Sequence, residues 1–315
     1  MAGFDDVTRR KRLSVGAYRR ITFVALVALF AIVVTGSLVR LTGSGLGCAD
    51  WPRCSKERFI DVSTGHGAIE QINRLFTGIV AASVVLAVLA SLRLEIRRPI
   101  LTKLSLGLVA GVIAQVVIGG IVVLTGLNPW ANMAHFLVSM ILLANALVLH
   151  RLTGTLPGSS EPVRSGGWPL EYIAGAFGLG AVITGTVVTA SGPHAGDENA
   201  VRFGFAIHNV ARVHSVTVLA TLAIVALLLW RSRGGSAPFE HAVARLFGLG
   251  LLQALVGYVQ YLADIPALLV AVHIALAGLV WLSLVDVIIL SLAGRSVSSR
   301  RVAQSSSGSP QPSTR

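Results

Sequence analysis

The residues of this sequence best suited to chemistry are histidines that recur near the beginnings of long apolar segments. His135, His214 and His273 each lie within the first turns of such a segment. Histidines on facing helices of a bundle can ligate a heme iron from both sides. A single histidine of this kind is more often a buried hydrogen-bonding residue, but His135 and His273 occupy matched places along the chain, which favours iron ligation.

A second polar group opens another apolar segment. Glu70 precedes Asn73 by about one helical turn, so both side chains project from the same helix face, and Arg74 follows directly. Glu70 fits two roles, a carboxylate stabilised by a helix N-terminus or a carboxylate beside the reactive edge of a substrate. Arg74 fits either an anchor at the membrane interface or a partner for a heme propionate.

The segment that carries His214 begins with two further candidates, His208 and Arg212. His208 and His214 are six positions apart, so on a helix of about 3.6 residues per turn they face different directions. Only one of the two can therefore be a ligand, with His208 as the alternative to His214. Arg212, like Arg74, is a candidate propionate contact or an interfacial anchor.

Membrane-spanning helices must position these residues. The chain of 315 residues is 54% hydrophobic and 13% charged, whereas a soluble protein carries about a quarter charged residues. A span needs about 20 apolar residues. The sequence predicts an all-α polytopic membrane protein with eight spans, at about 20–40, 73–92, 103–124, 131–150, 170–190, 208–230, 242–262 and 267–291.

The distribution of charge predicts the orientation. The net charge of +12 is the excess of 26 Lys and Arg over 14 Asp and Glu. Most of the Lys and Arg flank the spans on one side, as the positive-inside rule requires of cytoplasmic segments. We therefore expect both termini in the cytoplasm, the candidate residues near the outer face of a cell membrane, and no nucleic-acid partner. The flanking segments are a basic N-terminus (1–19), a cytoplasmic linker (152–169) and a disordered cytoplasmic tail (293–315).

The two halves of the chain resemble each other. Gln115 precedes His135 by the same interval that separates Gln253 from His273. Two motifs also recur: 115–119 (QVVIG) matches 253–257 (QALVG), and 34–37 (VTGS) matches 183–186 (ITGT). This pattern predicts two four-helix halves of the same topology, 20–151 and 170–292, related by an axis along the membrane normal.

The chain has two cysteines, Cys48 and Cys54, both in the predicted outer loop between the first two spans. An oxidising compartment permits a disulfide there. A pair spaced in this way is no zinc site without further ligands, and His66 alone does not supply them. A disulfide is the favoured interpretation, with two free thiols or a metal or heme role as the alternatives.

Two stretches resemble the heme A synthase family. The run 43–54 (GSGLGCADWPRC) is similar to the family's Gly-Ser-Gly-Leu-x-Cys-Pro-Asp-Trp-Pro-x-Cys loop, and 69–75 (IEQINRL) resembles its Glu-x-x-His-Arg motif. The loop motif is quite specific, and the resemblance extends from about Ile21 to Leu290. One departure is clear: the histidine of the family's second motif is Asn73 here, and asparagine is a poor iron ligand.

The resemblance implies an eight-helix enzyme that oxidises the methyl at ring position 8 of heme O to the formyl of heme A by successive hydroxylations, for cytochrome oxidase biogenesis. The first half would receive the substrate heme, and the second would hold a resident heme b. The resemblance implies that His214 and His273 are the axial ligands of the resident heme iron. It implies that His135 faces the substrate heme iron, in a site with Asn73 and Arg74. It also implies that Glu70 is the essential carboxylate and that Cys48 and Cys54 form the loop disulfide.

Expected partners are heme O, heme O synthase, the lipid bilayer and an electron donor that the sequence does not identify. A b-type membrane cytochrome is the alternative function, and it needs four good ligands, which Asn73 disfavours. A heme transporter is a further alternative, because parallel repeats occur in transporters.

Overall fold

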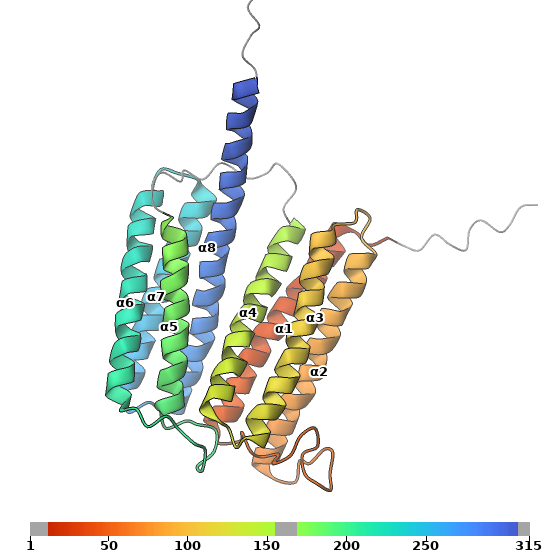
Figure 1. Ribbon diagram of the computed structural model, residues 1–315, viewed down its shortest axis with the longest axis vertical. Coiled ribbons are helices and arrows are strands. Elements are labelled where there is room, and N and C mark those ends of the chain that lie inside the picture. The colour runs from red at the N-terminus through yellow and green to blue at the C-terminus, as the bar shows by residue number, and fades with distance from the viewer. Residues whose placement is uncertain (1–11, 155–168, 308–315) are drawn as a thin grey trace, which may run out of the picture.

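Eight helices make up the protein in the computed structural model, which describes residues 12–154 and 169–307 (Figure 1). They are α1 (Val15–Leu41), α2 (Gly65–Leu92), α3 (Pro99–Leu124), α4 (Pro129–Gly154), α5 (Leu170–Ser191), α6 (Ile207–Ser232), α7 (Ala237–Leu262) and α8 (Ala267–Ser307). The described residues contain no strand beyond one isolated bridge between Leu13 and Leu94, so the predicted all-α class is confirmed.

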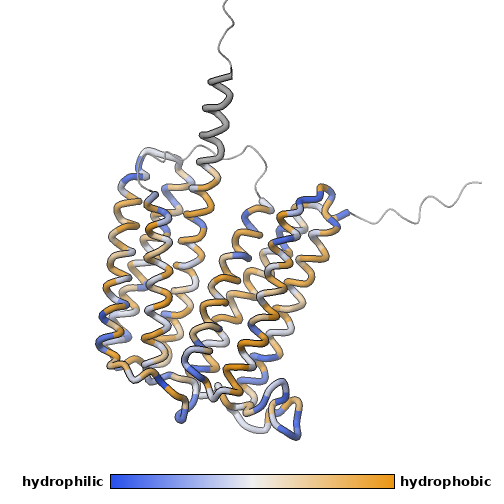
Figure 2. Tube along the Cα trace, in the orientation of Figure 1, coloured by the Kyte–Doolittle hydropathy of each residue, from blue (hydrophilic) through white to orange (hydrophobic). Residues whose placement is uncertain are grey.

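All eight helices are long and apolar enough to cross a membrane. Figure 2 shows apolar residues along the middle of the helices and hydrophilic residues at their ends and in the loops. Many large apolar side chains point outward, where they would be costly in water but suit a hydrocarbon solvent. The chain is therefore a multi-pass membrane protein.

Each half forms its own four-helix bundle, and the two bundles stand side by side (Figure 1). In the first, α1 packs on α2 and α4, and α3 packs on α2 and α4; in the second, α5 and α7 pack on α6 and α8 in the same order. The bundles meet through α1 and α4 on one side and α5 and α8 on the other. The helices of each half thus occupy equivalent positions.

Loops 42–64, 125–128, 192–206 and 263–266 all lie at one end of the molecule, which we call the disulfide end (bottom of Figure 1). Two of these loops are joined directly, since the Gly45 N–H donates to the Gly196 carbonyl at 2.9 Å. Leu127 packs between them in a small cluster with Val122 and Ala195. The two halves therefore share one continuous cap.

At the opposite end, charged residues tie the halves together. Asp286 of α8 is 2% exposed and accepts from Arg151 of α4 at 2.5 Å and from Arg245 of α7 at 2.6 Å. The indole N–H of Trp281 in α8 also donates to the Met140 carbonyl of α4 at 2.8 Å. Polar contacts thus cross the interface between the halves.

Two predicted boundaries are wrong. The second helix begins at Gly65 rather than near 73, because the Thr64 hydroxyl caps it by accepting from the Gly67 N–H at 3.0 Å, and its polar first turns are satisfied by the loop. The last helix continues to Ser307, so 293–307 is not the disordered tail that we expected. No proline or glycine interrupts the stretch from Arg295 until Gly308.

Parts of three predicted segments lie outside the described residues. These are 1–11 of the basic N-terminus, 155–168 of the linker and 308–315 of the tail.

Candidate functional site

Two histidine rings face each other inside the second half. The ring centroids of His214 on α6 and His273 on α8 are 6.5 Å apart, and the rings are inclined at 78°. A metal–imidazole bond of about 2.0 Å on each side, with roughly 1.2 Å from ring centre to nitrogen, would separate two axial rings by roughly 6.4 Å. The pair therefore has the separation of two imidazoles that share one iron.

A hydrogen bond from the preceding helix orients each ring. Thr184 Oγ1 lies 3.1 Å from Nδ1 of His214, and the side-chain amide of Gln253 lies 3.1 Å from Nε2 of His273. Nδ1 of His273 is buried and has no hydrogen-bond partner among the described residues. Partners of this kind fix ring orientation in metal-ligating histidines and leave the other nitrogen for the metal.

Glycines make room for both rings. A Cβ atom at Gly257 would lie 2.9 Å from Cε1 of His273, and one at Gly185 would lie 3.1 Å from Cε1 of His214. These separations are shorter than van der Waals contact, so any side chain would displace the rings. The repeated glycines of the two recurring motifs thus allow histidine-bearing helices to approach their neighbours closely.

The equivalent positions in the first half hold one imidazole and one amide. A Cβ atom at Gly119 would lie 3.4 Å from Cε1 of His135. A Cβ atom at Gly36 would lie 3.9 Å from Nδ2 of Asn73. The Thr35 hydroxyl donates to Oδ1 of Asn73 at 2.9 Å. Nδ1 of His135 is buried without a hydrogen-bond partner in the described part of the chain.

Gln115 serves the first half as Gln253 serves the second, but by a different contact. Its amide donates to the backbone carbonyl of His135 at 2.9 Å and to the hydroxyl of Ser139. It therefore fixes the helix that carries the imidazole instead of the ring itself. The His135 ring is held less tightly than that of His273.

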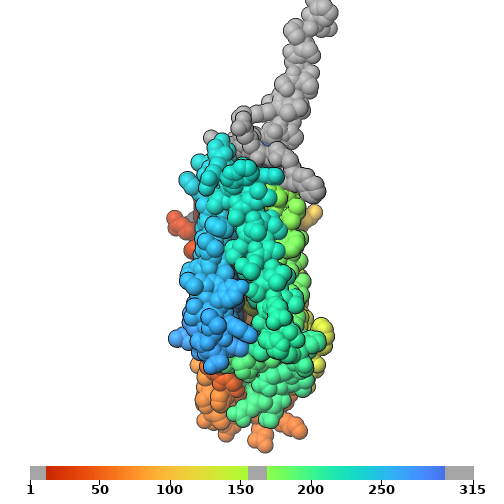
Figure 3. Space-filling view, turned by 90° about the vertical axis from the view of Figure 1, so that its left-hand side faces the viewer, coloured from red at the N-terminus to blue at the C-terminus, as the bar shows by residue number. Residues whose placement is uncertain are grey.

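A cavity of about 520 Å³ opens beside the histidine pair. Both His214 and His273 line it, and so do Ser37 and Arg40 of α1 and Met140 of α4. Figure 3 shows the face of the second half formed by α6 and α7, which is hollowed between these helices. This volume is in the range of protein sites for organic cofactors, about 300–1,000 Å³.

The other candidates on α6 are also in this cavity wall. His208 and Arg212 line it near the disulfide end, and both are exposed. The ring that lies opposite His273 is that of His214. The geometry therefore favours His214 over His208 as the partner of His273.

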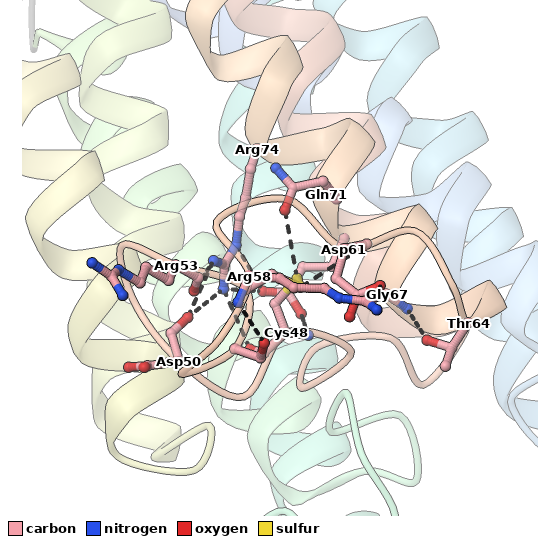
Figure 4. The surroundings of a disulfide bond; sticks show 12 residues. Cys48, Asp50, Arg53, Arg58, Asp61, Thr64, Gly67, Gln71 and Arg74 are labelled. Atoms are coloured by element: carbon pink, nitrogen blue, oxygen red, sulfur yellow. Dashed lines mark hydrogen bonds and ion pairs between the residues drawn. A yellow bond between two sulfur atoms is a disulfide. The ribbon is translucent and has the colours of Figure 1, made fainter.

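Glu70 and Arg74 form an ion pair on α2, and Figure 4 shows Arg74 reaching into the loop between α1 and α2. Glu70 is 5% exposed, and its two oxygens are engaged separately. Oε2 accepts from the backbone N–H of Cys48 at 2.7 Å, and Oε1 accepts from the guanidinium of Arg74 at 2.6 Å. The carboxylate is therefore bound to the loop and to its neighbour on α2.

Arg74 extends this connection. Its guanidinium donates to the backbone carbonyls of Cys48, Asp50 and Arg53 at 3.1–3.3 Å, as Figure 4 shows. One ion pair on α2 thus determines the path of the loop across 48–53. This role was not predicted from the sequence, because it depends on how the loop folds back over the helix.

The loop is closed by a covalent link and carries an aromatic side chain toward the first-half site. The sulfur atoms of Cys48 and Cys54 are 2.00 Å apart, at disulfide distance. Trp51 packs against α3 so closely that a Cβ atom at Gly120 would lie 2.7 Å from its ring. Since Gly119 faces His135, Trp51 and His135 lie against neighbouring residues of α3. The adjacent glycines 119 and 120 were the sequence signal for this contact.

Further along the same loop, Asp61 is held as a carboxylate. Hydrogen bonds from Ser63 and, to a lesser extent, the charge of Arg58 hold the pKa of Asp61 below its usual value. The Asp61 backbone carbonyl also lies 3.8 Å from Sγ of Cys54.

Three of the remaining histidines have other partners, and His241 is exposed. His66 pairs with Ser44 at 2.9 Å, His150 with Thr22 at 3.1 Å and His194 with the Ile265 carbonyl at 2.8 Å. No cluster of three or more metal-ligating side chains occurs in the parts of the chain that the structure describes. A bare metal ion would lack ligands here, whereas an iron with four ring nitrogens of its own needs only an axial pair.

Parts of the chain are similar in sequence to known proteins. The sequence model of the cytochrome oxidase assembly protein family (COX15-CtaA) matches residues 19–66, which include the disulfide loop. The chain is 31% identical over 138 residues to a heme A synthase of Geobacillus thermodenitrificans, covering 42% of this chain and 43% of that protein.

Two further relatives carry the same name. The chain is 32% identical over 106 residues to a heme A synthase of Geobacillus kaustophilus, covering 34% and 33% of the two chains. It is 36% identical over 129 residues to one of Listeria welshimeri, covering 39% and 41%. Each matched stretch thus spans less than half of the relative, so the chain is similar to heme A synthases over part of their length.

Proposed function

We propose that this chain, as a member of the heme A synthase family, oxidises heme O to heme A for cytochrome oxidase biogenesis. The observation that carries the proposal is the contrast between two equivalent sites. The second half has facing imidazoles of His214 and His273, whereas the first half has His135 opposite an asparagine position. One site is suited to keep a heme, and the other is suited to exchange one.

The chemistry is a stepwise oxidation of one methyl group. In each of two hydroxylations, one atom of dioxygen enters a C–H bond, and the other leaves as water with two protons and two electrons from a one-electron donor. The second hydroxylation gives a geminal diol, which loses water to become the formyl group. The protein must therefore bind the substrate, deliver electrons and exclude competing reactions.

His214 and His273 would hold a resident heme b, which supplies electron transfer when bound. Their spacing, the buried unpartnered Nδ1 of His273 and the glycines that accommodate both rings fit an iron porphyrin. Thr184 and Gln253 would keep the rings oriented through the hydrogen bonds described above. Held by both imidazoles, this group would supply electron transfer and not oxygen chemistry.

His135 would bind the substrate heme in the first half. With Asn73 at the equivalent ligand position, the substrate iron would be held from one side only, so product can leave. Arg74 and Asn73 lie on α2, and Trp51 lies against Gly120 of α3, the residue after the glycine that faces His135. The disulfide loop would thus cover the substrate and limit the access of water.

Glu70 remains the proposed catalytic carboxylate of this site. In the described state both of its oxygens are engaged, one by Cys48 and one by Arg74. A direct part in the reaction therefore requires the loop to release one of these bonds when substrate enters. A carboxylate in a low-dielectric pocket could then stabilise positive charge or carry a proton.

The proposed location is the cell membrane, with both termini in the cytoplasm and the disulfide end outside. Most basic loop residues support this orientation, because they lie at the end opposite the disulfide: Arg93, Arg97, Arg98, Arg151, Arg231 and Arg233. A disulfide also persists in an oxidising compartment. Heme O would arrive from a heme O synthase, and the electrons from a separate donor.

Extraction of the hemes from purified protein, followed by mass analysis, tests the proposal. Heme b together with heme O, a hydroxylated intermediate and heme A would support synthesis. Heme b alone, in a strain that makes heme O, would instead support a b-type cytochrome. Heme O carried unmodified through repeated turnover would support a transporter.

A further inference from the structure

The cavity beside the histidine pair is strongly asymmetric in charge. Its wall contains two arginines and four histidines (Arg40, Arg212, His194, His208, His214 and His273), but no aspartate or glutamate in the described part of the chain. Four of these residues lie near the disulfide end, away from the facing rings. A ligand that fills this cavity is therefore expected to carry anionic groups at that end.

Arg40 differs from the other cation in this wall. It lies in the last turn of α1, in the first half, and its guanidinium crosses to the second half to donate to the Thr189 carbonyl of α5 at 2.7 Å. Nε of Arg40 is buried and has no hydrogen-bond partner, and no carboxylate lies within ion-pair distance of Arg40 among the described residues. Arg212, in contrast, is exposed.

Arg40 is partly buried, and the buried N–H of its Nε is costly unless something completes its bonding. The side chain is also held in position, because Gly196 of the facing loop packs on its stem, where a Cβ atom would lie 3.5 Å from Cγ of Arg40. A guanidinium presents parallel N–H donors that match the two oxygens of a carboxylate. The unpartnered Nε thus leaves one N–H donor of this guanidinium free for a carboxylate.

We propose that Arg40 binds a carboxylate of the porphyrin held between His214 and His273, so that a residue of the first half completes the site in the second half. This inference rests on the resident-heme site of the proposed function. It assigns the carboxylate-bearing edge of the porphyrin to the disulfide end, under the cap that the 42–64 and 192–206 loops share. The proposed contact also implies that heme binds tightly only when the two halves are packed together.

The test compares two porphyrins, one with free carboxylates and one with both carboxylates converted to neutral methyl esters. Full-length protein from cells with a limited heme supply is titrated with iron protoporphyrin IX and with its dimethyl ester. The unmodified protein should bind the free acid more tightly than the ester. Arg40→Gln should weaken binding of the free acid by roughly tenfold to a hundredfold, the size of one charge-assisted hydrogen-bonded contact, and leave binding of the ester unchanged.

Two further variants separate a specific contact from general disturbance. Arg202→Gln removes a cation at the same end that bonds to the Gly192 and Pro193 carbonyls but does not line the cavity, and it should keep the preference for the free acid. Arg40→Lys should keep part of that preference, because lysine retains the positive charge but lacks the parallel N–H donors of the guanidinium. The midpoint potential of the bound heme should also fall in Arg40→Gln, because a nearby positive charge favours the reduced state.

Equal losses for acid and ester in Arg40→Gln, or no preference for the acid in the unmodified protein, would overturn the assignment of Arg40. Either result would leave the resident heme in place. If the unmodified protein bound neither porphyrin, the resident-heme site of the proposed function would itself be wrong, and this inference with it. The ester comparison on the unmodified protein decides the question even if Arg40→Gln does not fold.

Discussion

The two halves use the same scaffold for different side chains. On α6, His214 lies against Gly185 and bonds to Thr184; on α2, Asn73 lies against Gly36 and bonds to Thr35. Helix position, glycine contact and threonine partner are all retained, and only the atom offered to an iron differs. The comparison teaches that a repeat can keep its geometry while one half gives up a ligand.

The halves also differ at the residue that directly follows the recurring motifs 115–119 and 253–257. Gly120 of α3 admits the ring of Trp51 from the disulfide loop, whereas the equivalent residue of α7 is Tyr258, whose hydroxyl lies 2.5 Å from that of Ser215. The first half is thus covered by a side chain from a loop, and the second is bordered by side chains of its own helices. A loop can move as substrate enters, so this difference also fits exchange in the first half and retention in the second.

The most severe change should be His273→Ala, which removes one of the two facing imidazoles. We expect the absorbance of a bis-histidine heme to disappear from the purified protein, together with product formation. His208→Ala is the matched control, because His208 lines the same cavity without facing His273. Loss of the heme spectrum in His208→Ala and its survival in His214→Ala would reverse the ligand assignment.

Glu70→Ala should separate the two halves functionally. The resident heme spectrum should persist, since none of Glu70's hydrogen bonds reaches the histidine pair, and heme A formation should fall by at least a hundredfold. The hundredfold figure is the rough size of a general acid–base contribution. Heme extracts of the variant should contain heme O without heme A. Full activity would show that Glu70 is dispensable.

Asn73→His restores an imidazole at the position equivalent to His214. A Cβ atom at Gly36 would lie 3.9 Å from Nδ2 of Asn73, which leaves space for a ring. We expect a heme in the first half to be retained and turnover to fall about tenfold, because an occupied sixth position hinders oxygen chemistry and product release. The ratio of heme to protein after extensive washing measures the first effect. An unchanged ratio with normal turnover would contradict the ligand comparison between the halves.

Adding a methyl group at matched glycines should affect the halves unequally. Gly257→Ala places Cβ 2.9 Å from the His273 ring, and Gly119→Ala places it 3.4 Å from the His135 ring. Overpacking costs about 1–3 kcal/mol, which is roughly a fivefold to hundredfold loss of heme affinity for Gly257→Ala. Gly119→Ala should leave binding of the resident heme unchanged. Equal effects of both substitutions on that heme would be inconsistent with separate sites.

The smallest effect should come from the contact between the halves far from either site. Asp286→Asn weakens the bonds to Arg151 and Arg245, and both arginines are partly exposed, so we expect a loss of about 1–2 kcal/mol in the free energy of unfolding. Thermal unfolding in detergent measures this loss. The heme spectrum of the folded protein should not change, and a changed spectrum would indicate that this end of the interface shapes the cavity.

The sequence predicted the helices well, because apolar runs of sufficient length have few alternatives in a bilayer. It also matched Gln115 with Gln253 and His135 with His273, since the repeat places them at equal intervals. The boundary at Gly65 was missed because polar residues in the first turns of α2 hide the helix from a hydropathy criterion. These polar side chains form hydrogen bonds with the loop, and a hydropathy criterion does not register such bonds.

Contacts between distant segments could not be predicted in this way. Three such contacts depend on how a loop or a second half folds back over a helix: Trp51 with Gly120, Arg40 with Thr189 and Glu70 with Cys48. Arg40 in particular was indistinguishable from an interfacial anchor, because its place in the cavity exists only when the halves dock.

The central claim is that one heme is held and the other visits. Its most direct test is the number and identity of hemes in full-length protein purified with and without a supply of heme O. We predict one heme b per chain under both conditions, with heme O, its hydroxylated form and heme A appearing below one per chain only when heme O is supplied. Two tightly bound hemes b per chain, or none, would contradict this account.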